Sequence, residues 1–200
     1  MIFENRQEAL NRLLDVLDKE IVQNCVVLSI SKNGTFYARE IALRYGMLEG
    51  DFLFIEEVKS PINKEASLAS VSETKDSIII KELVDSFEIS DDYIYNEIER
   101  VYEDKILENI HKFRAGEGII SLENKNVLLV DEGANTGLTL LCAIKSCINK
   151  KVNSINVAIP VVAKATAEMV EKIVDNTFFV KIIEDYVDTK FYFKEYDCEL

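Results

Sequence analysis

Apolar residues in the first part of the chain alternate between the spacing of helices and that of strands. One group recurs every three or four residues, which places its side chains on one face of a helix; the group is Leu10, Leu13, Leu14, Leu17 and Ile21. Residues 25–30 then form a short apolar run that predicts a strand, and a second helical pattern ends at Gly46. Residues 51–58 predict the next strand. The predicted order is therefore helix, strand, helix, strand.

The rest of the chain continues this alternation. Residues 91–115 predict a long charged helix with an apolar inner face, which ends near Gly116. Residues 126–130, NVLLV, form a short run typical of a strand covered on both faces of a parallel sheet. The remaining predicted elements are a helix at 138–148, a strand at 155–160, a helix at 166–174 and a strand at 178–183. This order predicts an α/β fold, with a doubly wound, mainly parallel sheet and helices on both faces.

One segment breaks the alternation. Residues 59–81 contain Pro61, one of only two prolines, and two short strand patterns at 67–71 and 77–81. We expect these strands to pair locally and the segment to form a mobile hairpin or flap over the cleft of the sheet. Because no linker rich in Gly, Ser or Pro divides the chain, residues 1–200 are expected to form a single domain.

The composition excludes several kinds of partner. Asp and Glu number 36 and Lys and Arg number 23, which gives a formal charge of -13. Such a chain lacks the basic surface that binds nucleic acids or anionic membranes. It also shows no secretory signal and no apolar run near the ~18 residues of a membrane span. We therefore expect a cytoplasmic protein whose partners are small molecules. A second copy of the chain is a further candidate partner.

The cysteines point to the same compartment. They form no C-x-x-C pair, which argues against a zinc site or a thioredoxin-like motif; they are Cys25, Cys142, Cys147 and Cys198. We expect them to be reduced, and those in apolar patterns to act as small buried side chains.

Candidate chemistry is concentrated in VDEGANTGLT, residues 130–139, between a predicted strand and helix. Asp131 and Glu132 place two carboxylates at the strand tip, suited to the hydroxyls of a diol or to a hard cation such as Mg²⁺ and not needed for packing. The glycines that follow allow backbone N–H groups and a helix N-terminus to converge on an anion. Together these halves fit a sugar phosphate. An ordinary connection in which Thr caps the helix explains the same letters. Walker A and G-x-G-x-x-G loops are absent.

The segment VLLVDEGANTGLT, residues 127–139, resembles the phosphoribosyl pyrophosphate signature of type I phosphoribosyltransferases. Nearly the whole chain is similar to bacterial phosphoribosyltransferase-domain proteins of unassigned substrate that begin with F-x-x-R-x-x-A, here Phe3, Arg6 and Ala9. The resemblance implies a Rossmann-like sheet, Mg²⁺-bound phosphoribosyl pyrophosphate, and displacement of pyrophosphate by a nitrogen base or a similar nucleophile.

The resemblance also assigns roles by position. Asp131 and Glu132 would be the catalytic acids, which hold the ribose hydroxyls and, directly or indirectly, Mg²⁺. The phosphoribosyl group would be bound by Gly133, Ala134, Asn135, Thr136, Gly137, Leu138 and Thr139. The pyrophosphate loop would be Ser31, Lys32, Asn33 and Gly34, where relatives typically read P-R-G-G.

Two glutamates depart from the pattern of these relatives. Glu56 and Glu57 stand where the relatives have an Arg-Lys pair, so two charges are reversed where pyrophosphate is expected. Because neighbours in a strand face opposite sides, at least one glutamate should point away from the ligand. Lys59 and Lys64 follow closely and could restore positive charge, although loop lysines are usually solvated.

The acceptor base has weaker candidates. Tyr186, in IIEDYV, is placed like the aromatic residue that stacks on the base in salvage enzymes, and Lys164 could meet an exocyclic oxygen. A core aromatic and a solvated lysine are the alternative interpretations. Asn135 stands where purine-salvage members carry an acid that moves a base proton, which an amide cannot do. His111, the only histidine, is expected at the surface of a helix.

Two functions follow from the sequence. The first is a phosphoribosyltransferase with an unidentified, nitrogen-base acceptor. The second is a regulatory module that binds phosphoribosyl pyrophosphate or a nucleotide without turnover, which Glu56 and Glu57 favour. An interaction module whose loop binds nothing is a third interpretation, which the match to both chemical halves of the signature disfavours.

Overall fold

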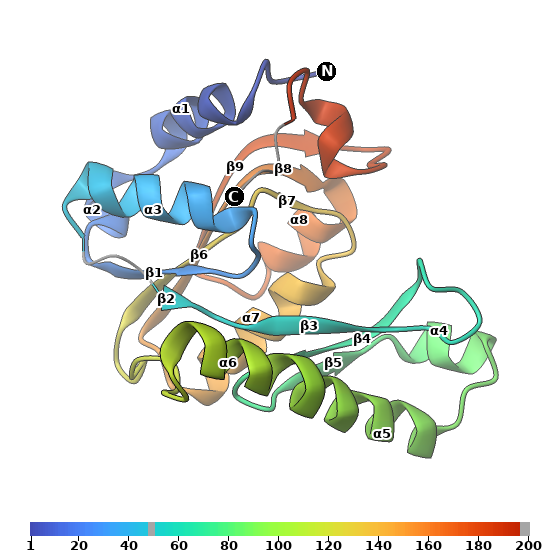
Figure 1. Ribbon diagram of the computed structural model, residues 1–200. Helices are drawn as coiled ribbons and strands as arrows, with labels where there is room; N and C mark the ends of the chain where they lie inside the picture. Colours follow the sequence, from blue (N-terminus) through green and yellow to red (C-terminus); the bar gives the residue numbers. More distant parts are fainter. Residues whose placement is uncertain (48–50, 197–200) are drawn as a thin grey trace.

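The computed structural model describes residues 1–47 and 51–196. Within them, the main sheet has the order β2-β1-β6-β8, and both β7 and β9 pair with β8. Its strands are β1 (Cys25–Ser29), β2 (Asp51–Phe52), β6 (Asn126–Val130), β7 (Gly133–Ala134), β8 (Ser154–Ala163) and β9 (Asn176–Ile183). All of these pairs are parallel. The predicted α/β fold with a mainly parallel sheet is confirmed (Figure 1).

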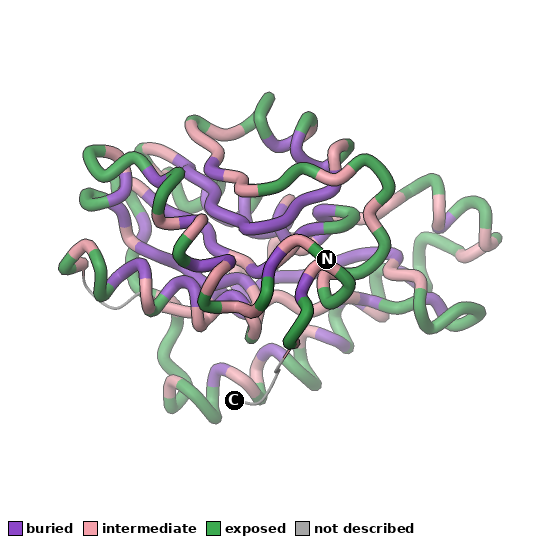
Figure 2. The backbone as a smooth tube through the Cα atoms, turned by 90° about the horizontal axis from the view of Figure 1, so that it is seen from above, coloured by how far each residue is buried: buried purple, intermediate pink, exposed green. Residues whose placement is uncertain are grey.

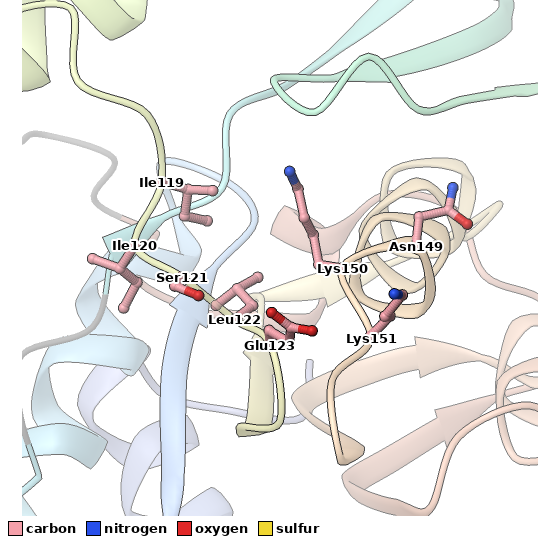
Figure 3. A pocket seen from close by; sticks show the side chains of 8 residues that line it. All are labelled: Ile119, Ile120, Ser121, Leu122, Glu123, Asn149, Lys150 and Lys151. Atoms are coloured by element: carbon pink, nitrogen blue, oxygen red, sulfur yellow. The ribbon is translucent and has the colours of Figure 1, made fainter.

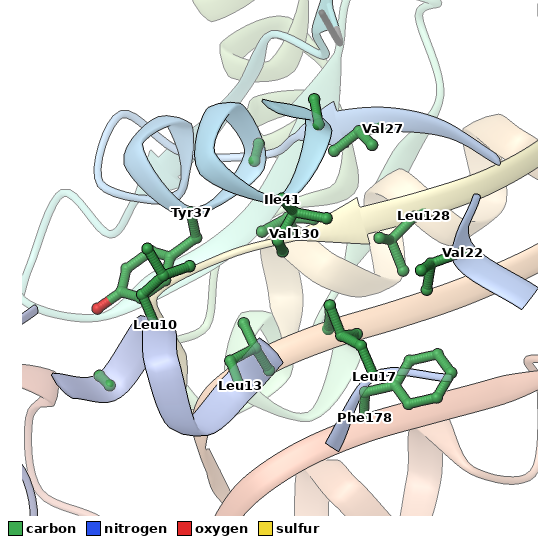
Figure 4. Packing of buried hydrophobic residues seen from close by; sticks show 14 of the residues in the cluster. Leu10, Leu13, Leu17, Val22, Val27, Tyr37, Ile41, Leu128, Val130 and Phe178 are labelled. Carbon is green, nitrogen blue, oxygen red and sulfur yellow. The ribbon is translucent and has the colours of Figure 1, made fainter. Parts of the chain in front are cut away.

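Helices cover both faces of this sheet. Along β6, Leu128 and Val130 pack toward one face, and Val127 and Leu129 pack toward the other. The first face is covered by α1 (Arg6–Val16) and α3 (Gly34–Tyr45), and the second by α7 (Leu138–Asn149) and α8 (Lys164–Val170). Figure 4 shows the first of these layers, with side chains of α1 and α3 meeting those of β1, β6 and β9. Burial is accordingly deepest along the strands (Figure 2).

Two sequence predictions were wrong in detail. The pattern from Leu10 to Ile21 is not one helix, because Leu17 is extended and Asp18 caps a separate short helix, α2 (Lys19–Val22). Residues 51–58 are not one strand either. After β2 the backbone leaves the main sheet at Phe54, whose N–H bonds to Glu73 Oε1 at 2.9 Å and whose carbonyl accepts from Glu73 N at 2.9 Å. Because both backbone polar groups of Phe54 are hydrogen-bonded here, the chain can pass from the main sheet into a second sheet.

The second sheet has the order β3-β4-β5 and is antiparallel. Its strands are β3 (Ile55–Lys59), β4 (Ser67–Ser72) and β5 (Ser77–Ile79). The pairing of β4 with β5 confirms the expected local pairing. Ser70 Oγ donates to the Leu138 carbonyl at 3.1 Å, and Ser72 Oγ and Ser146 Oγ lie 2.8 Å apart, so β4 is anchored to α7. Mobility of residues 59–81 stays a prediction.

The long charged helix was predicted correctly. It comprises α5 (Asp91–Val101), a π-helical turn (Tyr102–Ile106) and α6 (Leu107–Arg114), after the short helix α4 (Lys81–Ser86). It packs on the second sheet through a core that includes Val58, Leu68, Val71, Ile94, Ile98 and Ile106. It ends at Ala115, which has a left-handed φ of 50°, one residue before the predicted glycine. No helix among the described residues combines the length and apolar character needed to cross a bilayer.

Arg114 joins the parts of this fold. Its guanidinium bonds to Glu73 at the end of β4, reaches Asp51 of β2 at 3.4 Å, and lies 4.7 Å from the centre of the Phe54 ring. The Glu73 side chain is 2% exposed, and burial raises the pKa of Glu73 despite the bonds from Arg114 and the Phe54 N–H. The passage of the chain between the two sheets therefore depends on the buried Glu73 carboxylate and on its ion pair with Arg114.

Replacing that cation should reveal its contribution to stability. We expect Arg114→Met to lower the free energy of unfolding by about 3 kcal/mol, because Glu73 is left buried without its cation. Because burial already raises the pKa of Glu73 and should raise it further in the variant, the loss should grow as the pH rises above the ordinary range of a glutamate carboxyl and the carboxylate ionises. Urea unfolding measures both effects. Arg100→Met, which removes an exposed partner of Glu97, is the control and should leave unfolding nearly unchanged; equal behaviour of the two variants would contradict the assignment.

Candidate functional site

Two adjoining cavities open at the carboxyl ends of β1 and β6. The larger, of about 310 Å³, is lined by Ser31, Lys32, Asn33, Asp131, Glu132, Gly133 and Thr189. The smaller, of about 180 Å³, is lined by Glu57, Asp131, Gly133, Ala134, Asn135, Thr136, Gly137, Leu138, Thr139, Leu140 and Thr189. Asp131, Gly133 and Thr189 border both cavities. The structure thus brings the two predicted loops to one place, with Asp131 between them.

Asp131 follows β6 directly and links the two loops. Its Oδ1 accepts hydrogen bonds from Ser31 Oγ and, at 2.7 Å, from the Glu132 N–H. Burial raises the pKa of Asp131 to about 6, although both bonds favour the ionised form. Both bonds within the described residues use Oδ1, so Oδ2 is available to a ligand. At neutral pH this residue supplies a carboxylate that can accept hydrogen bonds from hydroxyl groups.

Glu132 has a different environment from its neighbour. It is 1% exposed, and its Oε1 lies 2.8 Å from Arg6 Nε and 3.4 Å from the Tyr37 hydroxyl. Its Oε2 accepts from the Tyr196 hydroxyl at 2.6 Å. The expectation that neither acid is needed for packing is therefore wrong for Glu132, because a buried carboxylate with these donors forms part of the core.

The loop after β1 is held against the tip of β6. Ser31 Oγ accepts from the Gly34 N–H at 2.9 Å while it donates to Asp131. A Cβ on Gly34 would lie 2.8 Å from the Val130 carbonyl oxygen, so only glycine allows α3 to start so close to β6. Lys32 is exposed and borders the larger cavity. The loop therefore places one positive side chain at this cavity.

The loop from Gly133 to Thr139 has the glycine-dependent geometry expected of an anion nest. Gly137 has a φ of +73°, and a Cβ there would lie 2.7 Å from Thr166 Cγ2. At Gly133 a Cβ would lie 2.6 Å from Thr189 Oγ1. Helix α7 starts immediately afterwards, so its first N–H groups border the smaller cavity. In the alternative interpretation, a threonine caps the helix that follows. The structure shows only a long hydrogen bond of this kind, from the Leu138 N–H to Thr136 Oγ1 at 3.4 Å.

Glu56 and Glu57 face opposite sides of β3, as the alternation of a strand requires. Glu57 borders the smaller cavity, and its Oε2 accepts from Ser67 Oγ at 2.7 Å and pairs with Lys59. Glu56 faces α6 and the turn before it, where Asn109 Nδ2 lies 3.4 Å and Lys105 Nζ 3.8 Å from its carboxylate. The expectation that one glutamate points away is confirmed.

The basic and aromatic candidates contribute less to the cavities. Lys59 compensates Glu57, whereas Lys64 lies in the exposed loop between β3 and β4. Lys164 forms an exposed ion pair with Glu184 at 2.8 Å, so the structure does not bring it to the cavities. The Tyr186 hydroxyl lies 2.7 Å from Thr189 Oγ1, and its ring packs on Tyr192 with centres 5.0 Å apart.

Tyr186 therefore contacts Thr189, which borders both cavities, and does not line either cavity itself. Burial raises the pKa of its hydroxyl. Thr189, which borders both cavities, was missed in the sequence, as were Thr166, Tyr37 and Tyr196. No local pattern marks these residues, because each acquires its role by contact with a distant segment. Arg6 was the exception, since it belongs to the F-x-x-R-x-x-A opening.

Another cavity lies at the opposite end of the sheet. It has a volume of about 290 Å³ and is formed by the segment that leads into β6 and by the end of α7 (Figure 3). Its lining consists of Ile119, Ile120, Ser121, Leu122, Glu123, Asn149, Lys150 and Lys151. None of the predicted site residues borders it, so the candidate site is the pair of cavities around Asp131.

Comparison with known proteins agrees with this geometry. The phosphoribosyl transferase domain family matches residues 4–193. Among proteins with curated descriptions, none matches the chain.

Several solved structures share the fold. The protein TT1426 from Thermus thermophilus is 23% identical, with a TM-score of 0.74 and coverage of 98% of this chain and 91% of its own. A purine phosphoribosyltransferase from Pyrococcus horikoshii is 13% identical, with a TM-score of 0.52 and coverage of 100% and 96%. A hypoxanthine phosphoribosyltransferase from Staphylococcus aureus is 14% identical, with a TM-score of 0.53 and coverage of 92% and 78%. Because the family match spans nearly the whole chain and includes the signature at residues 127–139, the chain belongs to the phosphoribosyl transferase domain family, as a type I member.

Proposed function

We propose that the protein transfers ribose 5-phosphate from phosphoribosyl pyrophosphate to a nitrogen-base acceptor. One observation carries this proposal: Asp131 stands between two adjoining cavities, one bordered by the loop after β1 and the other by the glycine loop before α7. In open α/β sheets the crevice beyond the carboxyl ends of the strands is where ligands bind. A sugar with phosphate groups at two ends fits two anion loops that flank one acid.

Each part of the substrate has a proposed partner. The smaller cavity would take the 5′-phosphate, through the first N–H groups of α7 and the hydroxyls of Thr136 and Thr139. Asp131 would accept hydrogen bonds from the ribose hydroxyls. The larger cavity would take the pyrophosphate, with Lys32 as its positive side chain. Glu132 is buried against Arg6 and would support the site without touching the sugar.

The reaction would need little covalent chemistry from the protein. The bond between ribose C1 and the pyrophosphate oxygen breaks with its electron pair on the oxygen, and a bond forms between C1 and the acceptor nitrogen. The Asp131 carboxylate would stabilise positive charge on the ribosyl ring, and the two loops would hold the reacting groups in place. Asn135 cannot accept the proton of the acceptor. That proton would pass to the departing pyrophosphate or to water.

Mg²⁺ is the proposed cofactor. Among the described residues, no group of three or more His, Cys, Asp or Glu side chains is placed to hold a metal ion. Mg²⁺ is, however, commonly bound by one or two carboxylates together with substrate phosphates. Asp131 fits this role through Oδ2, whereas both Glu132 oxygens accept hydrogen bonds from tyrosine hydroxyls within the protein. When bound, the ion would neutralise phosphate charge.

A regulatory module that binds phosphoribosyl pyrophosphate or a nucleotide without turnover is the second candidate, and Glu57 favours it. An uncompensated carboxylate about 4 Å from a phosphate charge opposes binding by roughly 4 kcal/mol at an effective dielectric near 20. Lys59 compensates part of the charge of Glu57. Because Glu57 borders the smaller cavity, the remaining repulsion would act on the 5′-phosphate of phosphoribosyl pyrophosphate, lower the affinity for this substrate and so disfavour turnover.

A pyrophosphate-release screen with Mg²⁺, phosphoribosyl pyrophosphate and a panel of bases tests the transferase proposal. We expect release with at least one base, and at least about tenfold weaker ligand binding in Asp131→Asn because a charged acceptor becomes neutral. Phosphorus NMR detects binding without turnover. Binding without release for any base would favour the regulatory module, and no binding would contradict both functions.

The pKa of Asp131 adds a pH signature to this variant. Because that pKa is about 6, protonation should weaken ribose 5-phosphate binding to the wild type as the pH falls through this value. The ligand phosphate itself titrates near pH 6, so the diagnostic quantity is the ratio of wild-type to Asp131→Asn affinity, which should approach one at low pH. The raised pKa also means that the ionised carboxylate lowers stability above it. The variant should therefore be at least as stable as the wild type at neutral pH.

Gly137 tests the nest before α7. Gly137→Ala should weaken phosphate binding and destabilise the fold by about 2 kcal/mol, because the new Cβ is strained by the positive φ and also meets Thr166. Gly46→Ala is a matched control: its φ is +65°, but no atom of the described residues lies within 4 Å of its Cβ. The control should lose stability only, by about 1 kcal/mol. Calorimetric titration with inorganic phosphate and thermal unfolding measure the two effects. Unchanged phosphate binding in Gly137→Ala would place the nest elsewhere.

Glu57 and Glu56 form a second matched pair. Glu57→Gln should raise the affinity for phosphoribosyl pyrophosphate by about tenfold, or 1.4 kcal/mol, because it removes a carboxylate from the cavity and leaves Lys59 uncompensated. Glu56→Gln should have little effect, since Glu56 faces α6. The difference should shrink at high salt. An equal response of both variants in calorimetric titrations would show that Glu57 does not face the ligand.

A further inference from the structure

The two ends of the described chain are joined beside the larger cavity. Phe3 and Phe193 form a parallel bridge and are both buried, with ring centres 5.2 Å apart. The Phe3 N–H donates to the Tyr192 carbonyl at 2.9 Å, and the Lys194 N–H donates to the Phe3 carbonyl at 2.9 Å. Figure 1 shows the blue start of the chain beside the red end segment. The ends therefore pack as one unit.

Each end then sends one side chain to the same buried carboxylate. Arg6 comes three residues after Phe3, and Tyr196 three residues after Phe193. Arg6 Nε lies 2.8 Å from Glu132 Oε1, and the Tyr196 hydroxyl donates to Glu132 Oε2 at 2.6 Å. We call Arg6, Glu132 and Tyr196 the terminal clasp.

The same two side chains also hold the loop after β1. Arg6 Nη2 donates to the Asn33 carbonyl at 2.6 Å, and Asn33 Nδ2 donates to the Tyr196 hydroxyl at 2.9 Å. The Arg6 guanidinium also lies 4.9 Å from the centre of the Phe36 ring in α3. The side chain of Asn33, which precedes the first residue of α3, makes no capping bond to the helix, so it is committed to the clasp instead.

This attachment differs from the one that faces the cavity. On that side the loop is held through Ser31 to Asp131, whose carboxylate also meets the proposed ligand. A ligand on Asp131 Oδ2 would share this carboxylate with the bond from Ser31 to Oδ1. The clasp reaches Asn33 through Arg6 and Tyr196, which line neither cavity. It can therefore keep the loop in place while Asp131 is occupied.

We infer that the terminal clasp is a positioning device for the loop from Ser31 to Gly34. Arg6 and Tyr196 line neither of the two cavities and act on the ligand through Asn33. Glu132 borders the larger cavity, but both of its carboxylate oxygens accept hydrogen bonds from protein donors. The part of this inference that concerns the ligand rests on the proposed function, because only an anion in the larger cavity would use the loop. The hold on the loop itself is independent of any ligand. Chain ends far from each other in sequence thus control one binding loop.

Tyr196→Phe is the cleanest test. It deletes one hydroxyl that donates to Glu132 and accepts from Asn33, and it retains the ring that packs on Phe193 with centres 5.4 Å apart. Hydrogen exchange followed by NMR should show the Gly34 and Thr35 amides exchanging at least about tenfold faster than in the wild type, because the loop loses the hydrogen bond from Asn33 and Glu132 loses one of its donors. Amides of β6 and β8 should be unchanged.

Tyr192→Phe is the matched control. Its hydroxyl accepts from the Val187 N–H at 3.0 Å, and its loss should not affect the Gly34 and Thr35 amides. Arg6→Met is a less suitable variant, because it leaves Glu132 buried without its cation and could prevent folding. Arg6→Lys keeps the charge but not the fork that reaches both Glu132 and Asn33, and should show the same local effect if it folds.

Inorganic pyrophosphate with Mg²⁺ is the ligand probe. Its affinity should fall severalfold in Tyr196→Phe and stay at the wild-type value in Tyr192→Phe. Both variants should remain folded, with a lower melting temperature in Tyr196→Phe because the buried Glu132 carboxylate loses a donor. Wild-type exchange at Gly34 and Thr35 in Tyr196→Phe would overturn the clasp. Faster exchange with unchanged pyrophosphate affinity would overturn its positioning role. If the wild type binds neither pyrophosphate nor phosphoribosyl pyrophosphate, the proposed function fails, whereas the exchange rates still decide whether the clasp holds the loop.

Discussion

The buried ion pair between Arg6 and Glu132 constrains everything around the site. Removing two charges from water is costly, and only close geometry with additional hydrogen bonds offsets that cost. Here the offset comes from three parts of the chain: the first helix supplies Arg6, α3 supplies Tyr37, and the end segment supplies Tyr196. Satisfying one carboxylate therefore requires these elements to meet at the tip of β6. The position of the loop after β1 follows, because Arg6 also binds its Asn33.

The acid next to it has the opposite role. Asp131 accepts hydrogen bonds from a hydroxyl and a backbone N–H, and burial raises its pKa to about 6. Two consecutive carboxylates thus differ because both oxygens of Glu132 have protein donors, whereas Asp131 borders both cavities and its donors within the described residues use Oδ1 alone. This division separates the stability of the fold from the binding of a ligand. Perturbed carboxylates in clefts are typical of functional sites.

A chain with a formal charge of -13 can still be built to hold an anion. Among the described residues that line the two cavities, Lys32 is the only lysine or arginine. The remaining attraction comes from backbone N–H groups in the glycine loop and from the start of α7, which are fixed partial charges. The second sheet adds a negative contribution, since β3 carries Glu57 to the smaller cavity with Lys59 beside it. The balance of these charges sets how strongly the two cavities attract an anion.

The sequence by itself determined the α/β order, the strand NVLLV, the long charged helix and the loop from Asp131 to Thr139. These features are local, because apolar periodicity and the freedom of glycine to adopt a positive φ act within a few residues. Tertiary structure alone decided the break at Phe54, which depends on Glu73, and the different environments of Asp131 and Glu132. It also brought Thr189 and Tyr196 to the site. A buried charge or a strand that changes sheets is settled by partners from distant segments, and packing selects those partners only once the chain has folded.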